Sequence, residues 1–132
     1  MKSKLLMLLM ISVMLVSCKK DEEETPQKQT TAEITVLSAT NEAVDGVSVY
    51  AYKENTWTII GDNPVFSDKT VATDASGKAM FLVDDIHMIF SMDTQANLHF
   101  SVHYNIGGVD KTKTTAITFV QGDQKSASIK LD

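Results

Sequence analysis

Apolar and polar residues alternate with a period of two along most of the chain beyond residue 31. In one such segment, Val47, Val49 and Ala51 fall on one face, and Ser48 and Tyr50 fall on the other. Alternation of this kind is typical of strands that bury one face. The segments that show it are 32–36, 47–52, 70–73, 78–82, 98–105, 111–119 and 127–131.

Turn-forming residues separate these segments at short intervals. Gly107-Gly108 predicts a two-residue hairpin loop, and Gly77 in the stretch 74–77 predicts a second hairpin between 70–73 and 78–82. Short strands with regular turns favour an all-β fold, a single antiparallel β-sandwich of about seven strands. Residues 84–94 have a mixed period, which leaves a crossover loop and a single helical turn both open.

The first residues follow a different pattern, with Lys2 and Lys4 ahead of the almost wholly apolar run 5–16. A helix that crosses a bilayer needs about 20 apolar residues, so this run predicts a secretory signal. The residues that follow, Ser17 and Cys18, complete a segment Leu-Val-Ser-Cys that resembles the bacterial lipobox. The resemblance implies cleavage after Ser17 and acylation of Cys18. A transmembrane anchor, or an ordinary signal with a chance cysteine, is the alternative.

An acidic run comes directly after this cysteine and leads into polar sequence up to residue 31. Its composition is typical of a solvated tether. The run is also similar to the export mark of surface lipoproteins in Bacteroidetes. That similarity implies display on the outer membrane surface, with a periplasm-facing lipoprotein as the alternative. The residues of the run are Lys20, Asp21, Glu22, Glu23 and Glu24.

The expected organisation is therefore a signal peptide (1–17), a lipidated cysteine with a flexible tether (18–31) and a sandwich (32–132). Without residues 1–17 the chain has 12 − 2 = 10 lysines and 17 acidic residues, a net charge of 10 − 17 = −7, and no arginine. This balance argues against a nucleic-acid partner. Cys18 is the only cysteine, so no disulfide is expected within the fold.

Two stretches, EAVDGVSVYAY (42–52) and TVATDASGKAMFLV (70–83), resemble the prealbumin-like domains, which include transthyretin-like and carboxypeptidase-regulatory-like domains. The resemblance implies a β-sandwich fold and little chemistry. In size and layout the chain is also similar to lipoproteins that accompany Bacteroidetes conjugative transposons. The matching residues are Gly46, Val47, Val49, Thr73, Asp74, Gly77, Ala79 and Phe81.

Candidate catalytic and metal-binding residues are few. His99 and His103 lie four apart on one strand, about 13 Å from each other and too far apart to share a metal ion. His87 lies near Asp84 and Asp85, an arrangement with acid–base potential but without a nucleophile motif. The acidic turns lack the Asp-x-Asp-x-Asp run of a calcium loop. We therefore expect no enzyme activity, metal or cofactor.

The longest connection, residues 53–68, contains the single tryptophan, Trp57. One interpretation is a loop pinned to the sandwich by Trp57, Ile59 and Phe66. The other is an aromatic platform of Tyr50, Tyr52 and Trp57 that holds a glycan ring or a partner's side chain. The expected function is a non-enzymatic, lipid-anchored accessory module that contacts a protein partner, and the alternative is a surface carbohydrate-binding lipoprotein.

Overall fold

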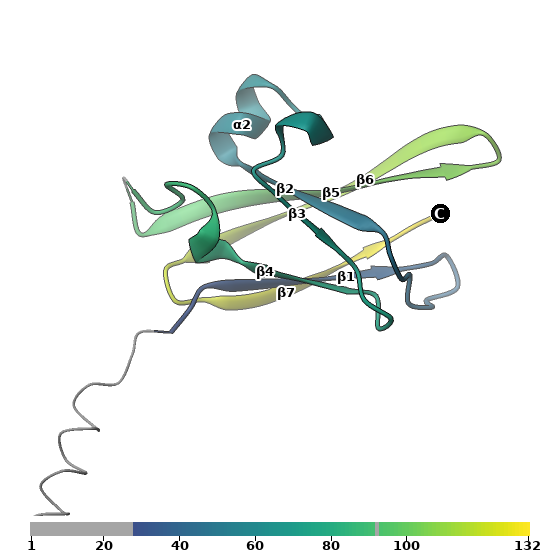
Figure 1. Ribbon diagram of the computed structural model, residues 1–132, viewed down its shortest axis with the longest axis horizontal. Coiled ribbons are helices and arrows are strands. Elements are labelled where there is room, and N and C mark those ends of the chain that lie inside the picture. The colour runs from purple at the N-terminus through teal and green to yellow at the C-terminus, as the bar shows by residue number, and fades with distance from the viewer. Residues whose placement is uncertain (1–27, 92) are drawn as a thin grey trace, which may run out of the picture.

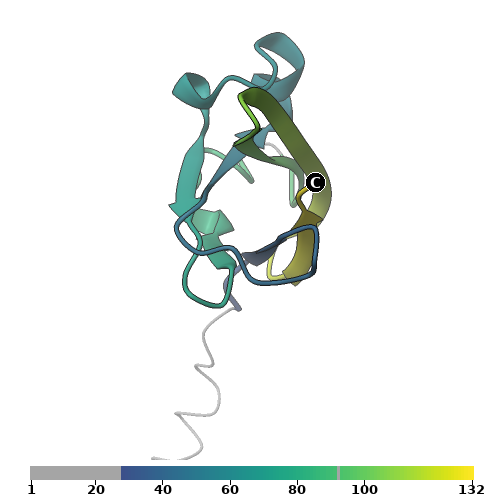
Figure 2. The ribbon, with the colours of Figure 1, turned by 90° about the vertical axis from the view of Figure 1, so that its right-hand side faces the viewer.

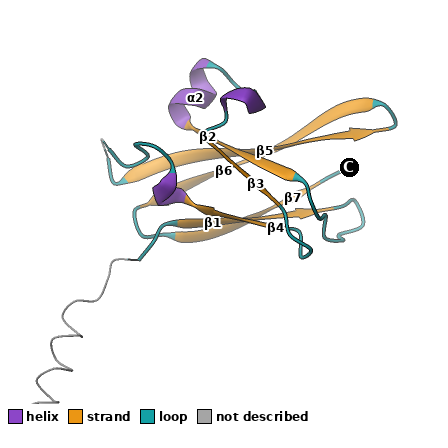
Figure 3. Cartoon of the chain, in the orientation of Figure 1, coloured by secondary structure: helices purple, strands orange, loops and turns teal. Residues whose placement is uncertain are grey.

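The computed structural model describes residues 28–91 and 93–132. These residues form two β-sheets that face each other, with one short helix outside them (Figures 1 and 3). The elements in chain order are β1 (Thr31–Leu37), β2 (Ser48–Lys53), α2 (Glu54–Ile59), the 3-10 turn η1 (Pro64–Phe66), β3 (Lys69–Ala72), β4 (Lys78–Leu82), the 3-10 turn η2 (Val83–Asp85), β5 (Gln95–Ile106), β6 (Val109–Val120) and β7 (Gln124–Lys130).

The three-stranded sheet has the order β4-β1-β7, and the four-stranded sheet has the order β3-β2-β5-β6. The end-on view in Figure 2 shows the two layers. This arrangement confirms the predicted all-β sandwich of about seven strands. Every pair is antiparallel except β1 and β7, which run parallel from Thr31 beside Gln124 to Leu37 beside Lys130.

The core lies between the inner faces of the two sheets. Phe81 on β4 meets Phe100 on β5 edge to face, with 5.2 Å between ring centroids, and this contact joins the layers. Each buried side chain of this size contributes about 1.5–3 kcal/mol through removal of apolar surface from water. The buried residues of the core are Ala32, Ile34, Val36, Val49, Ala51, Ala79, Phe81, Val83, Ile86, Leu98, Phe100, Val102, Phe119 and Ile129.

Of the two predicted hairpins, one is confirmed and one is wrong. Gly107 and Gly108 have φ angles of 58° and 84°, and Ile106 pairs with Val109 across them. The turn at residues 74–77 forms, but it leads from β3 in one sheet to β4 in the other. β3 and β4 do not pair with each other because β4 pairs with β1 instead. The residues of the turn give no indication of this partner.

The connection before β5 contains the helical turn η2, one of the two alternatives left open for residues 84–94. The first residues of the domain are hydrogen-bonded to this turn. The backbone N–H of Thr30 donates to the Asp84 carboxylate at 2.8 Å, and the Thr30 hydroxyl accepts from the Gly122 N–H at 2.7 Å. Thr30 is fully buried, so the folded part begins slightly before residue 32.

Gly77 provides a matched test of the close approach between the 74–77 turn and β1. Gly77 and Gly46 have φ angles of +75° and +72°, but a Cβ at residue 77 would lie 2.7 Å from the Val36 carbonyl oxygen, whereas a Cβ at residue 46 meets nothing within 4 Å. We expect Gly46→Ala to cost about 1–2 kcal/mol of backbone strain. Gly77→Ala should cost about 1–3 kcal/mol more through overpacking. Urea unfolding of both variants measures the difference, and equal losses would contradict the predicted clash.

Candidate binding site

Residues 54–68, here called the cap, leave β2, pass over the outer face of the four-stranded sheet and return to β3 (Figure 1). The cap begins with helix α2, which has Glu54 in its first turn and none of its residues fully buried. The helix is followed by Gly61, whose φ of +86° suits the residue after a helix end. The turn η1 then starts at Pro64, and the Asn63 side chain accepts the Val65 N–H at 3.2 Å.

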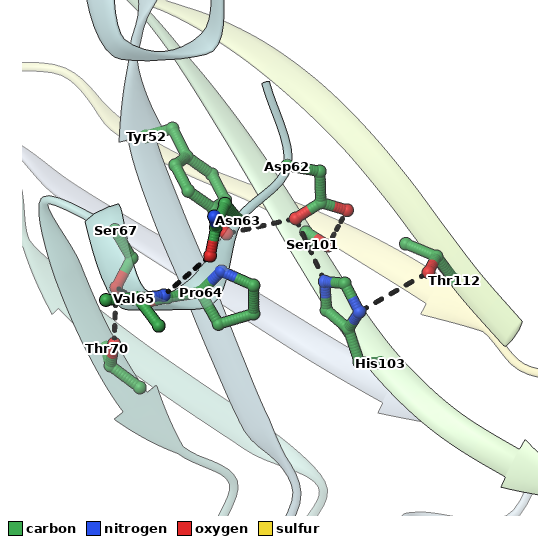
Figure 4. A network of polar contacts seen from close by, with 10 residues as sticks. All are labelled: Tyr52, Asp62, Asn63, Pro64, Val65, Ser67, Thr70, Ser101, His103 and Thr112. Carbon is green, nitrogen blue, oxygen red and sulfur yellow. Dashed lines mark hydrogen bonds and ion pairs between the residues drawn. The ribbon is translucent and has the colours of Figure 1, made fainter. Parts of the chain in front are cut away.

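The Asp62 carboxylate joins the cap to the sheet beneath it (Figure 4). Oδ1 accepts the Tyr52 hydroxyl at 3.0 Å and lies 2.9 Å from Nε2 of His103. Oδ2 accepts the Ser101 hydroxyl at 2.6 Å. Because Tyr52 and Ser101 are both fully buried, this one carboxylate satisfies two polar groups that the cap removes from water.

The network changes the acidity of its members. Burial of the Asp62 carboxyl would by itself raise its pKa, but hydrogen bonds from Ser101, His103 and Tyr52 outweigh burial and lower the pKa below its ordinary value. Burial and the hydrogen bond to Asp62 raise the pKa of the Tyr52 hydroxyl well above its ordinary value. Asp62 is thus ionised and Tyr52 protonated at neutral pH, the states that their hydrogen bond requires.

A second set of contacts holds helix α2. The Trp57 indole stacks on the His99 imidazole of β5, with 4.6 Å between ring centroids and 2° between ring planes, and it also meets the Tyr52 ring at 5.4 Å. His99 Nε2 lies 2.6 Å from a carboxylate oxygen of Glu54 in the first turn of the helix. The interpretation of Trp57 as a residue that packs back on the sandwich agrees with these contacts.

The expectation that Ile59 and Phe66 also pack back on the sandwich is wrong. Ile59 is 82% exposed and Phe66 is 52% exposed. At 100° per residue, Ile59 lies about 200° around the helix from Trp57, so it points away when Trp57 faces the sheet. Ile60 and Val65 are exposed as well, so four large apolar side chains of the cap face solvent.

The three aromatic residues of the predicted platform are brought close together but not laid out as one exposed surface. Tyr52 is fully buried and has no surface for a ligand. Tyr50 is half-buried and meets His103 edge to face at 5.7 Å, and one face of Trp57 is occupied by His99. The geometry therefore gives a glycan-stacking surface less support than the sequence alone did.

The remaining candidates do not assemble into a site among the described residues. Within residues 28–91 and 93–132, no hydrogen bond or ion pair joins the His87 side chain to Asp84 or Asp85, and no cluster of three or more His, Cys, Asp and Glu has the geometry of a metal site. In that same part of the chain, no helix is long and apolar enough to cross a membrane. Ser17, Cys18 and the acidic run Lys20, Asp21, Glu22, Glu23 and Glu24 lie outside the described residues.

No family model matches the chain, and no curated protein or solved structure matches it significantly. The prealbumin-like resemblance accordingly stays a prediction about family, while the sandwich itself is observed.

The roles of Asp62, Glu54 and the two strand histidines were missed by sequence reasoning. Asp62 is separated from Tyr52 by 10 residues and from Ser101 and His103 by 39 and 41. These separations follow no motif. The available signal was the alternation that placed Ser101 and His103 on the face opposite the core, where a long connection such as 53–68 can pack.

Asp62→Asn tests how the network depends on pH. Because the pKa of Asp62 is lowered by folding, its contribution to stability is present above the unfolded-state pKa of about 3.9 and is lost as pH falls through the lower folded-state value. Loss of the charge should cost about 1–3 kcal/mol at pH 7. Denaturant unfolding at pH 7 and pH 3 should show this cost shrinking at the lower pH.

The matched control is Asp85→Asn, which neutralises an exposed carboxylate on η2 instead of the network carboxylate. If both variants show the same change between the two pH values, the stabilising role of Asp62 is refuted.

Proposed function

We propose that this chain is a non-enzymatic lipoprotein of the outer membrane, anchored through Cys18, whose cap binds a protein partner. The observation that carries the proposal is the concentration of exposed apolar side chains on a cap that is itself held firmly to the sheet. Contiguous apolar surface on a folded domain marks sites of protein association.

The exposed apolar side chains are concentrated on the cap. Four of the nine large apolar residues exposed in the described part of the chain fall within eight consecutive positions. They are Ile59, Ile60, Val65 and Phe66. Aliphatic and aromatic side chains that lose little mobility on binding are effective contact residues, because less entropy is lost when they become buried.

The attachment of the cap supports this role. Besides the Asp62 network, Asp68 accepts the Lys53 N–H at 2.8 Å and donates its own N–H to the Ala51 carbonyl at 2.8 Å. These two bonds tie the end of the cap to β2, the strand from which the cap begins. A surface preorganised in this way keeps its apolar side chains exposed without a rearrangement on binding.

The position of the cap suits a membrane-anchored protein. The described chain enters the fold at β1, in the three-stranded sheet, and the cap covers the outer face of the other sheet (Figures 1 and 2). The cap therefore lies on the layer that the tether does not enter, so attachment at Cys18 leaves it accessible to a partner. The association with a conjugative element rests on the resemblance in size and layout alone.

The anchor is tested by metabolic labelling with palmitate. The wild-type chain should incorporate the label and remain with outer membranes, and Cys18→Ala should do neither, because the acylated thiol is missing. A wild-type chain without label would overturn the anchored part of the proposal. Protease treatment of intact cells then separates two orientations, since cleavage indicates surface display and protection indicates a periplasm-facing protein.

The cap is tested by a photoreactive amino acid placed at Val65, which is 85% exposed. The control position is Met80, an apolar residue 54% exposed on β4 of the other sheet. Irradiated cells should give one discrete protein adduct from position 65 and none from position 80, and Phe66→Ser should reduce it. Equal labelling at both positions, or binding of purified protein to a polysaccharide that Trp57→Ala abolishes, would contradict the protein-partner proposal.

A further inference from the structure

Strand β6 is the longest free edge of the sandwich. It forms one border of the four-stranded sheet and pairs with β5 along all twelve of its residues. Its first half, with the matching part of β5, extends past the rest of the sheet as a two-stranded arm (Figure 1). The arm adjoins the base of the cap, since Thr112 Oγ1 lies 3.4 Å from His103 Nδ1 and His103 contacts Asp62 (Figure 4), but its outer edge is formed by backbone groups that the cap does not use.

The register shows which backbone groups of β6 face away from β5. A two-residue loop makes Ile106 and Val109 a hydrogen-bonded pair, and such pairs then recur at every second residue. The odd-numbered residues of β6 therefore bond to β5, and the even-numbered residues direct their N–H and C=O groups outward. Two contacts agree, since the Thr118 carbonyl and the Val120 N–H both find partners on the outer side.

Side chains hydrogen-bond the outward backbone groups at only one end of this edge. Lys125 Nζ donates to the Thr118 carbonyl at 2.7 Å, and the Asp123 carboxylate accepts the Val120 N–H at 2.8 Å. From residue 110 to residue 116, no backbone bond of the outward groups is found within the described part of the chain. An unpaired edge of this length is a template for another strand.

The side chains along the open stretch do not oppose pairing. Thr112, Thr114 and Ala116 occupy the outer face, are exposed and carry no charge. On the inner face, Lys111 and Lys113 would be a barrier to edge pairing if their charges were free. Both lie within 3.2 Å of the Asp132 carboxylate, which offsets one of their two positive charges and holds both side chains on the inner face.

We propose that β6 pairs antiparallel with β6 of a second copy of this chain, about a two-fold axis at Thr114. In this register Thr114 lies opposite Thr114 of the second copy, and Thr112 lies opposite Ala116. The two four-stranded sheets become one continuous sheet. Every outward N–H and C=O between residues 112 and 116 then has a backbone partner.

Charge complementarity favours a second copy as the occupant. The open stretch begins at the acidic Asp110 and ends near the basic Lys125, which lies over Thr118. The antiparallel two-fold arrangement sets Asp110 opposite Thr118 of the second copy and therefore near its Lys125. This occurs twice, and Lys125 then lies between Asp110 of the second copy and Asp123 of its own chain, which is 3.6 Å away. The tether of the same chain is a poor alternative strand, because its acidic run and Pro26 disfavour sheet pairing.

Engineered cysteines test the register directly in the full-length chain in its own membrane. Residues that face each other in a hydrogen-bonded pair have Cα atoms about 5.5 Å apart, within disulfide range. Thr114→Cys alone should therefore form a disulfide dimer under mild oxidation. Thr112→Cys alone and Ala116→Cys alone should not, because residue 112 lies about 13 Å along the strand from its own equivalent. The double variant Thr112→Cys with Ala116→Cys should form the dimer.

The wild-type chain, with Cys18 as its single cysteine, gives the background level of dimer. A Thr114→Cys signal no higher than this background overturns the proposal. Equal dimer from either single variant at residue 112 or 116 overturns it as well, since the register is then wrong.

Sedimentation of the detergent-solubilised full chain provides a second measurement. The wild type should have the mass of a dimer, and Thr114→Lys should reduce the dimer at least tenfold, because it places two cations opposite each other. Ile59→Lys on the cap is the control and should leave the dimer intact, so failure of the cap proposal and failure of this one are distinguishable. A monomeric wild type, or one copy of this chain in complex with another protein, overturns the proposal.

Discussion

The pairing of β1 with two strands at once is the constraint on which the rest of the fold depends. β1 is the centre of the three-stranded sheet, with β4 on one side and β7, the last strand, on the other. Its inward side chains Ala32, Ile34 and Val36 are completely buried. Because β1 and β7 run parallel, the first and last strands lie side by side, but the chain enters at Thr31 beside Gln124 and leaves at the opposite end, where Lys130 lies beside Leu37. β1 thus determines both where the chain enters the fold and which layer lies opposite the cap.

The opposite layer carries a cap that polar contacts hold more than apolar ones. Helix α2 has only six residues, none of them fully buried, so apolar burial contributes little beyond Trp57. The Asp62 carboxylate compensates with three hydrogen bonds to the sheet, and hydrogen bonds to a charged group are stronger than those between neutral groups. This arrangement leaves the apolar residues of the cap free to face outward.

The two proposed interaction surfaces differ in physical character. The cap offers exposed side chains, whose apolar area would drive association. The β6 edge offers backbone groups in a fixed register, with the uncharged side chains of Thr112, Thr114 and Ala116 on its outer face and charges of opposite sign toward its two ends. Side-chain surfaces and strand edges recruit partners by different interactions, so the two proposals can be tested by separate substitutions.

Features encoded by neighbouring residues could be predicted from the sequence alone. Alternation identified the strands and their inner faces, and Gly107-Gly108 identified the β5–β6 hairpin, because side-chain direction and positive φ are local properties. The lipobox at Cys18 is local as well and remains a prediction. The separation of β3 and β4 into different sheets, the burial of Tyr52 and the partners of Asp62 were decided only by the tertiary structure. Each depends on which strands lie side by side, and that follows from packing of the whole core and not from any short stretch of the chain.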